Sequence, residues 1–251
     1  MKLLDLPSSV LATFAEQGRG IRATDAGARP EELLELYDME GCPYCRVVRE
    51  ALTELDLDAH VYPCPKGGTR FRPRMESLGG RQQFPFLVDP NSRTMMYESA
   101  DIIEYLYRRY GKRAAPARPL VRLVRTPASL GATLLRGGRG VRMRASVEPE
   151  QPLELYSFEA SPFARQVRER LCELELPYIL RQSGRTQTLD WVAPAVRERI
   201  VPHYRPEQRN RLALLHETGR VRVPHLVDPN TRTRFYDSAA IIEHLERTYA
   251  R

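Results

Sequence analysis

The stretch of sequence that decides the fold is present twice. Residues Leu34–Cys45 read LELYDMEGCPYC, and residues Leu153–Ala164 read LELYSFEASPFA. Each copy opens with the alternating apolar and polar residues of a strand and closes near a proline that suits the first turn of a helix. The first copy ends in a CxxC motif, Cys42 and Cys45, whereas the second has serine and alanine at these positions. The chain is therefore a duplication in which one copy alone has the paired cysteines.

The repeat continues over most of the chain. Three further pairs of segments match: Phe84–Asn91 with Val223–Asn230, Tyr97–Leu106 with Tyr236–Leu245, and Pro7–Arg22 with Pro127–Arg142. Because the third pair lies upstream of the motif, we expect a helical lead-in segment before each copy. The spacing between the motif and the shared VDPN sequence is longer in the second copy. This difference predicts an insertion within residues 183–220, around Trp191, the only tryptophan.

The length of the chain indicates how many domains it can form. A chain of 251 residues suits two domains of ordinary size, each able to bury a core. We expect a first domain at residues 1–118, with its core at about 32–110. The second is expected at residues 119–251, with its core at about 152–250.

The N-terminus and the cysteine count indicate a compartment. No apolar run is long enough to span a bilayer, and residues 1–10, MKLLDLPSSV, lack the apolar stretch of a secretory signal. Four cysteines, two of them in one CxxC motif, suit a reducing compartment better than a disulfide framework. We therefore expect a cytoplasmic protein.

The net charge of +7 is concentrated in one segment. Residues 111–150 hold nine basic and two acidic residues, which accounts for the whole excess. Within it, residues 120–144 interleave Leu and Val with Arg, a pattern that can seat a helix on an anionic membrane surface. The alternative, favoured because Pro7–Arg22 is far less basic, is a solvated segment whose apolar side packs on its own domains. No aromatic residue interrupts the basic run, so we expect no nucleic-acid partner.

The pattern of each copy predicts an α/β fold. In the first copy we expect strands and helices in this order: strand Leu34–Tyr37, a helix after the motif, strand Ala59–Tyr62, helix Phe71–Leu78, a hairpin of Phe86–Val88 with Thr94–Tyr97, and a last helix capped by Ser99. This order, with a CxxC motif after the first strand, is a thioredoxin-type arrangement.

The CPYC motif, the X-Pro before the hairpin and the Glu-Ser pair at the last helix carry a resemblance. Each copy resembles the glutaredoxins and the N-terminal domain of glutathione transferases. The resemblance implies two tandem thioredoxin-like (β-α-β-α-β-β-α) domains and a glutathione-dependent thiol–disulfide oxidoreductase. Its partners would be glutathione, as cosubstrate, and disulfide or glutathionylated substrates. We expect neither copy to have the all-helical domain of glutathione transferases.

Cys42 and Cys45 are the expected catalytic residues. Cys42 lies where a strand gives way to a helix, and the free N–H groups and positive end of that helix favour a thiolate. Arg46, one turn on, can add a positive charge. Cys45 is expected to be more buried and suited to resolving a mixed disulfide. The alternative is a structural or metal-binding CxxC, but the chain has no second CxxC motif to complete a zinc site, so we expect no metal.

The resemblance also implies the glutathione-binding residues of the first copy. They are Tyr44, Lys66, Phe84, Pro85, Glu98 and Ser99. A cis peptide before Pro85 would turn the Phe84 backbone toward the thiol, and Glu98 with Ser99 would hold the γ-glutamyl end. Lys66 would meet the glycine carboxylate. The alternatives are a plain turn proline and a plain helix cap.

The second copy retains part of this pattern. Ser161 resembles the serine that many glutathione transferases use to hold the thiolate, and the accompanying residues are Val223, Pro224, Asp237 and Ser238. We expect either a second glutathione site or a scaffold that packs on the first domain. Two functional alternatives follow: glutathione transfer through Ser161, disfavoured by the missing helical domain, and a non-catalytic binding protein.

Two cysteines lie outside the motif. Cys64 is either an extra oxidisable thiol or a buried residue of the core, and Cys172 lies within a helical apolar pattern that predicts burial.

Overall fold

Eight strands form one mixed sheet in a computed structural model that describes residues 7–11 and 19–251. The strands are β1 (Leu34–Asp38), β2 (Ala59–Pro63), β3 (Phe86–Asp89), β4 (Thr94–Met96), β5 (Leu153–Ser157), β6 (Tyr178–Gln182), β7 (His225–Asp228) and β8 (Thr233–Phe235). The helices of the first half are α2 (Pro43–Glu54), α3 (Phe71–Gly79) and α4 (Ser99–Tyr110). The connecting segment between the halves contains α5 (Arg118–Leu120), the π-helical turn η1 (Val121–Arg125) and α6 (Thr126–Leu135). The helices of the second half are α7 (Pro162–Glu173), the 3-10 turn η2 (Thr188–Trp191), α8 (Pro194–Ile200), α9 (Arg209–Thr218) and α10 (Ser238–Tyr249).

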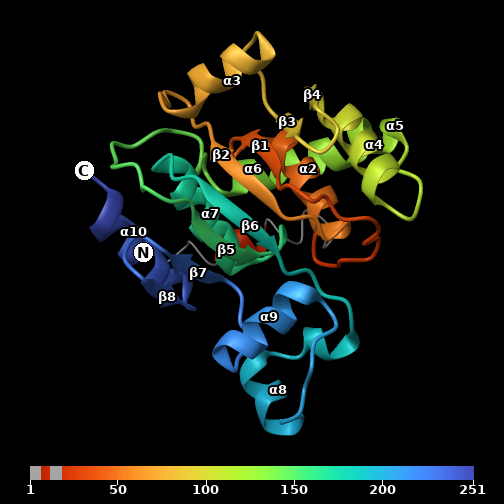
Figure 1. Cartoon of the computed structure of the whole chain (residues 1–251), viewed down its shortest axis with the longest axis vertical. Coiled ribbons are helices and arrows are strands. Elements are labelled where there is room, and N and C mark those ends of the chain that lie inside the picture. Colours follow the sequence, from red (N-terminus) through yellow and green to blue (C-terminus); the bar gives the residue numbers. More distant parts are fainter. Residues whose placement is uncertain (1–6, 12–18) are drawn as a thin grey trace.

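The strand order is β4-β3-β1-β2-β6-β5-β7-β8, so each half contributes four neighbouring strands (Figure 1). Within the first half β1 pairs with β2 in parallel, and β3 pairs with β1 and β4 in antiparallel; the second half repeats this with β5 to β8, as the thioredoxin-type prediction requires. The halves join where β2 pairs with β6 in antiparallel register, with Val61 opposite Tyr178 and Ala59 opposite Leu180. The predicted fold of two thioredoxin-like units is confirmed, and the two units share one sheet.

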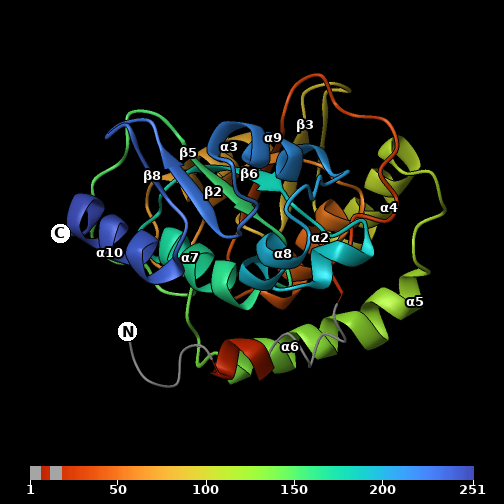
Figure 2. The same ribbon diagram turned by 90° about the horizontal axis from the view of Figure 1, so that it is seen from below.

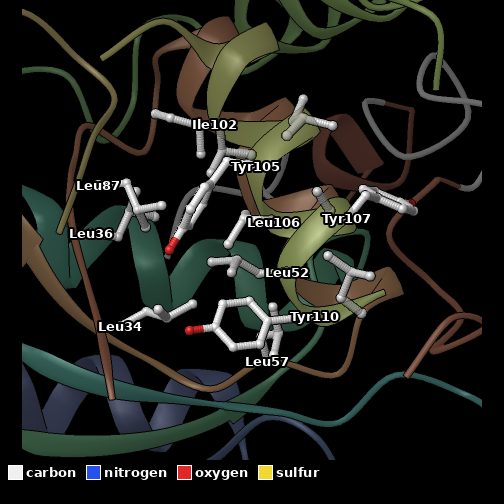
Figure 3. Packing of buried hydrophobic residues seen from close by; sticks show 14 of the residues in the cluster. Leu34, Leu36, Leu52, Leu57, Leu87, Ile102, Tyr105, Leu106, Tyr107 and Tyr110 are labelled. Atoms are coloured by element: carbon white, nitrogen blue, oxygen red, sulfur yellow. The ribbon is translucent and has the colours of Figure 1, made fainter. Parts of the chain in front are cut away.

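Each half has its own apolar core. In the first half, Leu34 and Leu36 of β1 meet Leu52 of α2 and Leu106 of α4, all of them fully buried (Figure 3). Helix α4 packs against α2, and α10 packs against α7 in the same way. These contacts fix the start of α2 and the start of α4 relative to the sheet.

Buried charges hold the two halves together under the β2–β6 junction. Arg49 of α2 donates to Glu40 (3.1 Å) and, across the junction, to Glu159 (2.9 Å), and also contacts Asp38. Its counterpart Arg168 of α7 pairs with the same two glutamates at 3.2 and 3.1 Å. Burial alone would raise the pKa of Glu159, but the guanidinium groups of Arg168 and Arg49 outweigh burial and lower it to about 2. Each arginine thus bridges acids from both halves.

Cys172 takes part in the same junction. Its sulfur accepts the backbone N–H of Glu40 (3.4 Å) and donates to Gly140 O (3.2 Å). In the first half the Thr53 hydroxyl plays the equivalent part and accepts the backbone N–H of Glu159 (3.2 Å). The thiol is buried, as its place in the helical pattern predicted.

The lead-in segments cross between the halves. Lys66 N–H, in the loop after β2, donates to Val141 O (2.6 Å), and Met143 N–H donates to Lys66 O (3.0 Å). In the other half, Arg185 N–H donates to Ile21 O at 2.8 Å, and Ala23 N–H donates back to Arg185 O at 3.0 Å. Each lead-in therefore pairs with the loop of the opposite half. The division between residues 118 and 119 stays a prediction.

The basic connecting segment lies along one side of the molecule beside the short helix Pro7–Leu11 (Figure 2). Arginines of this segment form ion pairs within the chain: Arg113 with Asp25, Arg118 with Asp101 and Glu104, Arg125 with Glu54, Arg136 with Glu169, and Arg144 with Glu246. Helix α6 packs against α2. Much of the positive charge is thus neutralised by the protein itself, which favours the packing alternative over a membrane surface. Among the described helices, none combines the length and apolar character needed to cross a bilayer.

The predicted insertion contains η2 and α8. Helix α9 corresponds to α3, because both end in a glycine with positive φ, Gly219 and Gly80, just upstream of β7 and β3. Helices α8 and α9 form a lobe at the bottom of Figure 1.

Candidate functional site

Four segments of the first half meet at one end of the sheet. Strands β1 and β2 are parallel, so the turn before Cys42 and the loop with Lys66 both follow the carboxyl ends of neighbouring strands. Strand β3 runs antiparallel to β1, which brings Pro85 to the same end, and β4 returns the chain there at Glu98. The topology therefore gathers the sequence-predicted residues of the first copy around the start of α2.

Side chains and backbone join these segments. Gln83 Nε2 donates to Glu98 Oε1 at 2.6 Å, which ties the loop before β3 to the start of α4. The Arg72 guanidinium lies 4.8 Å from the centre of the Phe84 ring and donates to Cys64 O (3.0 Å). Arg72 thereby holds the loop after β2 against the loop before β3. The Phe84–Pro85 peptide is cis, which agrees with the expectation for this position.

Cys42 is placed for thiolate chemistry. It is the N-cap residue of α2, its side chain is 8% exposed, and its backbone carbonyl accepts Arg46 N–H at 3.1 Å. The hydrogen bond from the Cys45 thiol, aided by the backbone N–H groups of Cys45 and Tyr44, lowers the pKa of Cys42 to about 7. Burial raises the pKa of Cys45 well above its usual value. The two thiols are therefore unlike: one ionises near neutrality while the other stays protonated.

Two neighbouring groups differ from simple expectation. The guanidinium of Arg46 is buried and lies 3.6 Å from Glu159 in the junction, and it is not among the main causes of the lowered pKa of Cys42. Asp38, at the end of β1, has a pKa raised to about 6, mainly by burial, and its negative charge opposes ionisation of Cys42 and Cys45. The helix start and the partner thiol, rather than Arg46, favour the thiolate.

The start of α4 is left uncapped. The N-cap position is Glu98, not Ser99, and no side chain caps the helix, so the prediction of a Ser99 cap was displaced by one residue. Glu98 adopts φ 67° and ψ 112°, a conformation that costs a non-glycine residue free energy. Ser99 is buried as the first helical residue. The first N–H groups of α4 are consequently free of any side-chain acceptor of the helix itself.

Tyr44 and Lys66 lie on the surface near this site. The Tyr44 ring, in the first turn of α2, is 54% exposed. Lys66 is exposed in the loop after β2, where its backbone pairs with residues 141–143. Cys64, two residues earlier, is fully buried and burial raises the pKa of its thiol, so it is an inert part of the core.

The corresponding positions of the second half are arranged differently. Ser161 is 2% exposed, and its hydroxyl accepts Ala164 N–H at 3.3 Å as the cap of α7. The lead-in helix Pro7–Leu11 lies over this turn, because Ser9 Oγ donates to Pro162 O at 2.7 Å. The Ser161 hydroxyl is thus used within its own helix.

The second half also closes the helix start that the first half leaves open. The Asp237 carboxylate accepts Ala239 N–H (2.9 Å) and Ala240 N–H (3.1 Å) and so caps α10, above the buried Ser238. The Val223–Pro224 peptide is cis like its counterpart. His225 beside it is buried, and burial lowers its pKa to about 4, so the imidazole is neutral. The backbone frame is kept, while the Ser161 hydroxyl and the Asp237 carboxylate each accept hydrogen bonds within the second half.

Several residues at the first site were not anticipated from the sequence. Arg72 and Gln83 join its loops, and the crossing segment at Gly140–Met143 forms one of its walls. A Cβ on Gly41, directly before Cys42, would lie only 2.3 Å from Cγ2 of Val141, so this glycine is required for the close approach. The sequence signal for the crossing segment was the repetition of the lead-in in both copies, which indicates that the lead-in belongs to the fold. Across residues 7–11 and 19–251, no cluster of three or more His, Cys, Asp or Glu side chains is arranged to hold a metal ion.

Comparison with known proteins places this arrangement in a family. Two solved structures of the Bombyx mori glutathione transferase BmGSTD1, the second in complex with GTT, align with 26% and 27% identity and a TM-score of 0.31. Each alignment covers 34% of this chain and 39% of the transferase, so the chain spans well under half of that relative's length. No curated protein matches the chain.

The family comparison reproduces the duplication. The pattern of the glutathione S-transferase N-terminal domain matches twice, at residues 36–114 and 155–251, and the two matches together cover more than half of the chain. Both matches carry the strand–helix–strand core described above. The chain therefore belongs to the glutathione S-transferase N-terminal domain family, of which it contains two units in tandem.

Proposed function

We propose that the protein is a glutathione-dependent thiol–disulfide oxidoreductase whose chemistry takes place at Cys42. The observation that carries the proposal is the pair of unlike thiols at the start of α2: Cys42, with a pKa of about 7, hydrogen-bonded by the buried and protonated Cys45. A thiol with a pKa near the ambient pH combines a large thiolate fraction with good nucleophilicity. We place the protein in the cytoplasm, where its four free cysteines would stay reduced.

The reaction would proceed by two exchanges at sulfur. The Cys42 thiolate attacks the glutathionyl sulfur of a glutathionylated substrate, the S–S bond breaks, and the substrate sulfur leaves as a thiolate that takes up a proton. A glutathione thiolate then attacks the glutathionyl sulfur of the Cys42 mixed disulfide, which releases glutathione disulfide and regenerates the Cys42 thiolate. With a protein disulfide, Cys45 can instead attack Cys42, and two glutathione molecules reduce the resulting internal disulfide. Glutathione supplies both electrons in either route.

The residues around Cys42 would bind the tripeptide. The backbone of Phe84, turned by the cis peptide before Pro85, would pair with the peptide of glutathione. The uncapped N–H groups at Ser99 suit the γ-glutamyl carboxylate, and Glu98, oriented by Gln83, suits its ammonium group. Lys66 would meet the glycine carboxylate and Tyr44 would cover the outer side.

Glutathione transfer through Ser161 is less well supported. The Ser161 hydroxyl already accepts a hydrogen bond from its own helix and is almost fully buried. Asp237 likewise occupies the N–H groups that a γ-glutamyl carboxylate would need. We therefore propose that the second half serves as a scaffold for the first.

Glutathione-coupled reduction of 2-hydroxyethyl disulfide tests the proposal. We expect turnover in the wild type, loss of turnover in Cys42→Ser, and retained turnover in Ser161→Ala. Circular dichroism of each variant controls for folding. A folded wild type without turnover would refute the oxidoreductase, and a glutathione conjugate of a model electrophile that is lost in Ser161→Ala would point to the transferase.

A further inference from the structure

We infer that Arg142, carried by the lead-in of the second copy, forms with Lys66 a two-cation site beside Cys42 that binds a carboxylate of the peptide thiol. This inference rests on the proposed function for the identity of the thiol. Lys66 alone was expected from the family resemblance. The new element is a binding residue supplied by the other half, which makes the site composite.

The backbone places the two cations side by side. Lys66 and Arg142 are partners in a parallel β-bridge, closed by Lys66 N–H to Val141 O (2.6 Å) and Met143 N–H to Lys66 O (3.0 Å). Partners in such a bridge project their side chains to the same face. Immediately upstream, Gly41 N–H donates to Gly140 O (3.3 Å). The bridge is therefore directly connected to the turn that carries Cys42.

The other half shows which way these side chains face. Arg185, the counterpart of Lys66, lies 5.6 Å from the centre of the Phe158 ring, in the turn before Ser161. By the internal symmetry of the chain, Lys66 faces the equivalent turn, which precedes Cys42.

Among the described residues, no acid pairs with Lys66 or Arg142. Both side chains are exposed, and neither forms a salt bridge or side-chain hydrogen bond with any of the described residues. Like charges opposite one another on neighbouring strands repel, so this arrangement is unfavourable until an anion binds between them. A carboxylate would relieve the repulsion and accept a bidentate hydrogen bond from the guanidinium group.

The equivalent pair in the second half is already occupied. Arg22 and Arg185 form the symmetry-related bridge, and both guanidinium groups lie over the ring of Trp191, at 5.6 and 4.4 Å from its centre. Such cation–π contacts, together with the nearby negative charge of Asp190, stabilise these charges. Trp191 belongs to the insertion, which the first half does not have. In the second half the cation pair is therefore covered by Trp191, and in the first half the equivalent pair is available to a ligand.

Calorimetric binding of S-methylglutathione tests the inference without requiring turnover. This thioether has the carboxylates of glutathione but no thiol that can exchange. We expect Arg142→Ala to weaken binding about tenfold, the range for loss of one charge-assisted hydrogen bond at a solvated position. Arg142→Lys should recover part of the affinity, and the matched control Arg22→Ala should leave it unchanged. S-methylglutathione with both carboxylates esterified should bind weakly and equally to the wild type and to Arg142→Ala.

The outcomes separate the inference from the proposed function. Equal affinity of the wild type and Arg142→Ala for S-methylglutathione would overturn the carboxylate site. So would a loss of affinity in Arg22→Ala as large as that in Arg142→Ala. The same conclusion would follow if a wild type that turns over 2-hydroxyethyl disulfide did not bind S-methylglutathione. Binding that depends on Arg142 in a protein without turnover would support the site and refute the oxidoreductase.

Discussion

The two halves share one backbone plan and differ in what their polar groups do. In the first, Cys42 has a partner thiol in Cys45, and the start of α4 is left uncapped. In the second, the Ser161 hydroxyl caps its own helix and the Asp237 carboxylate caps α10. The same loops with the same cis peptides thus form an open site in one half and a closed one in the other.

If the second half is the scaffold proposed above, this difference explains how a duplicated domain keeps its fold after it has lost its site. Closing the second site needed only short side chains that satisfy neighbouring N–H groups, and each such cap adds stability of about 1 kcal/mol. The first half retains an unfavourable backbone conformation at Glu98, and its two neighbouring cations, Lys66 and Arg142, have no acidic partner among the described residues. Both features lower the stability of the folded protein, as is expected at a functional site. The junction then links the two, because Arg49 and Arg168 each bind acids from both halves.

The strongest way to break the comparison is to separate the halves at their shared charges. We expect Arg49→Met and Arg168→Met each to lower the free energy of unfolding by about 3–5 kcal/mol, because either change removes one of the two buried arginines that share Glu40 and Glu159 and leaves these acids with less counter-charge. Trp191 fluorescence reports the second half, so its denaturant transition should shift in Arg49→Met although Arg49 lies in the first half. The exposed control Arg108→Met should change stability by no more than about 0.5 kcal/mol. A Trp191 transition that is unmoved in Arg49→Met would show that the halves unfold independently.

The sequence predicted the order of the elements because that order is encoded locally. Alternating residues at Leu34–Asp38 and the proline at the start of α2 specify a strand and a helix wherever they occur. The shared sheet was not predicted, because the pairing of β2 with β6 joins residues more than a hundred positions apart. Arg49 and Arg168 read as solvated helix residues, although both are buried. Their retention in both copies was the available signal that this charge has a shared structural use.

The residues of the candidate site likewise fall into some that the sequence could predict and others that it could not. Cys42 and Cys45 could be identified from a short motif, and Pro85 and Glu98 from resemblance, since each lies in a local sequence with a recognised geometry. Arg142 could not, because nothing local indicates that a lead-in crosses to the opposite half. Crossing depends on the antiparallel junction, which only the folded chain defines.

A second comparison concerns the thiol at the start of α2 and its counterpart at the start of α7. The Cys45 thiol is the main cause of the low pKa of Cys42, so Cys45→Ala should raise that pKa above 7. The thiolate fraction at pH 7 then falls, and alkylation of Cys42 by iodoacetamide should slow by about tenfold. Cys45→Ser, whose hydroxyl can still donate, should slow it less.

Ser161→Cys should give an unreactive thiol at neutral pH, because that position is buried and has no partner thiol. Rates followed by mass spectrometry against pH give each midpoint, and an unchanged midpoint in Cys45→Ala would contradict the assigned cause.

The smallest expected effect, but one with opposite signs in the two halves, concerns the residues before the last helices. Asp237→Ala should lower the free energy of unfolding by about 1 kcal/mol, because Ala239 and Ala240 lose their acceptor. Glu98→Gly should instead raise it by up to about 1 kcal/mol, since glycine adopts φ 67° with less strain than a residue that has a Cβ. Glu98→Ala, which keeps the strain and removes the carboxylate, isolates the small contribution of the Gln83 hydrogen bond. Because Glu98→Gly also removes the proposed partner of the glutathione ammonium, it should weaken S-methylglutathione binding while stabilising the fold. If Glu98→Gly destabilised the protein as much as Asp237→Ala does, Glu98 would be a structural residue like its counterpart, and the contrast between an open and a closed half would fail at this position.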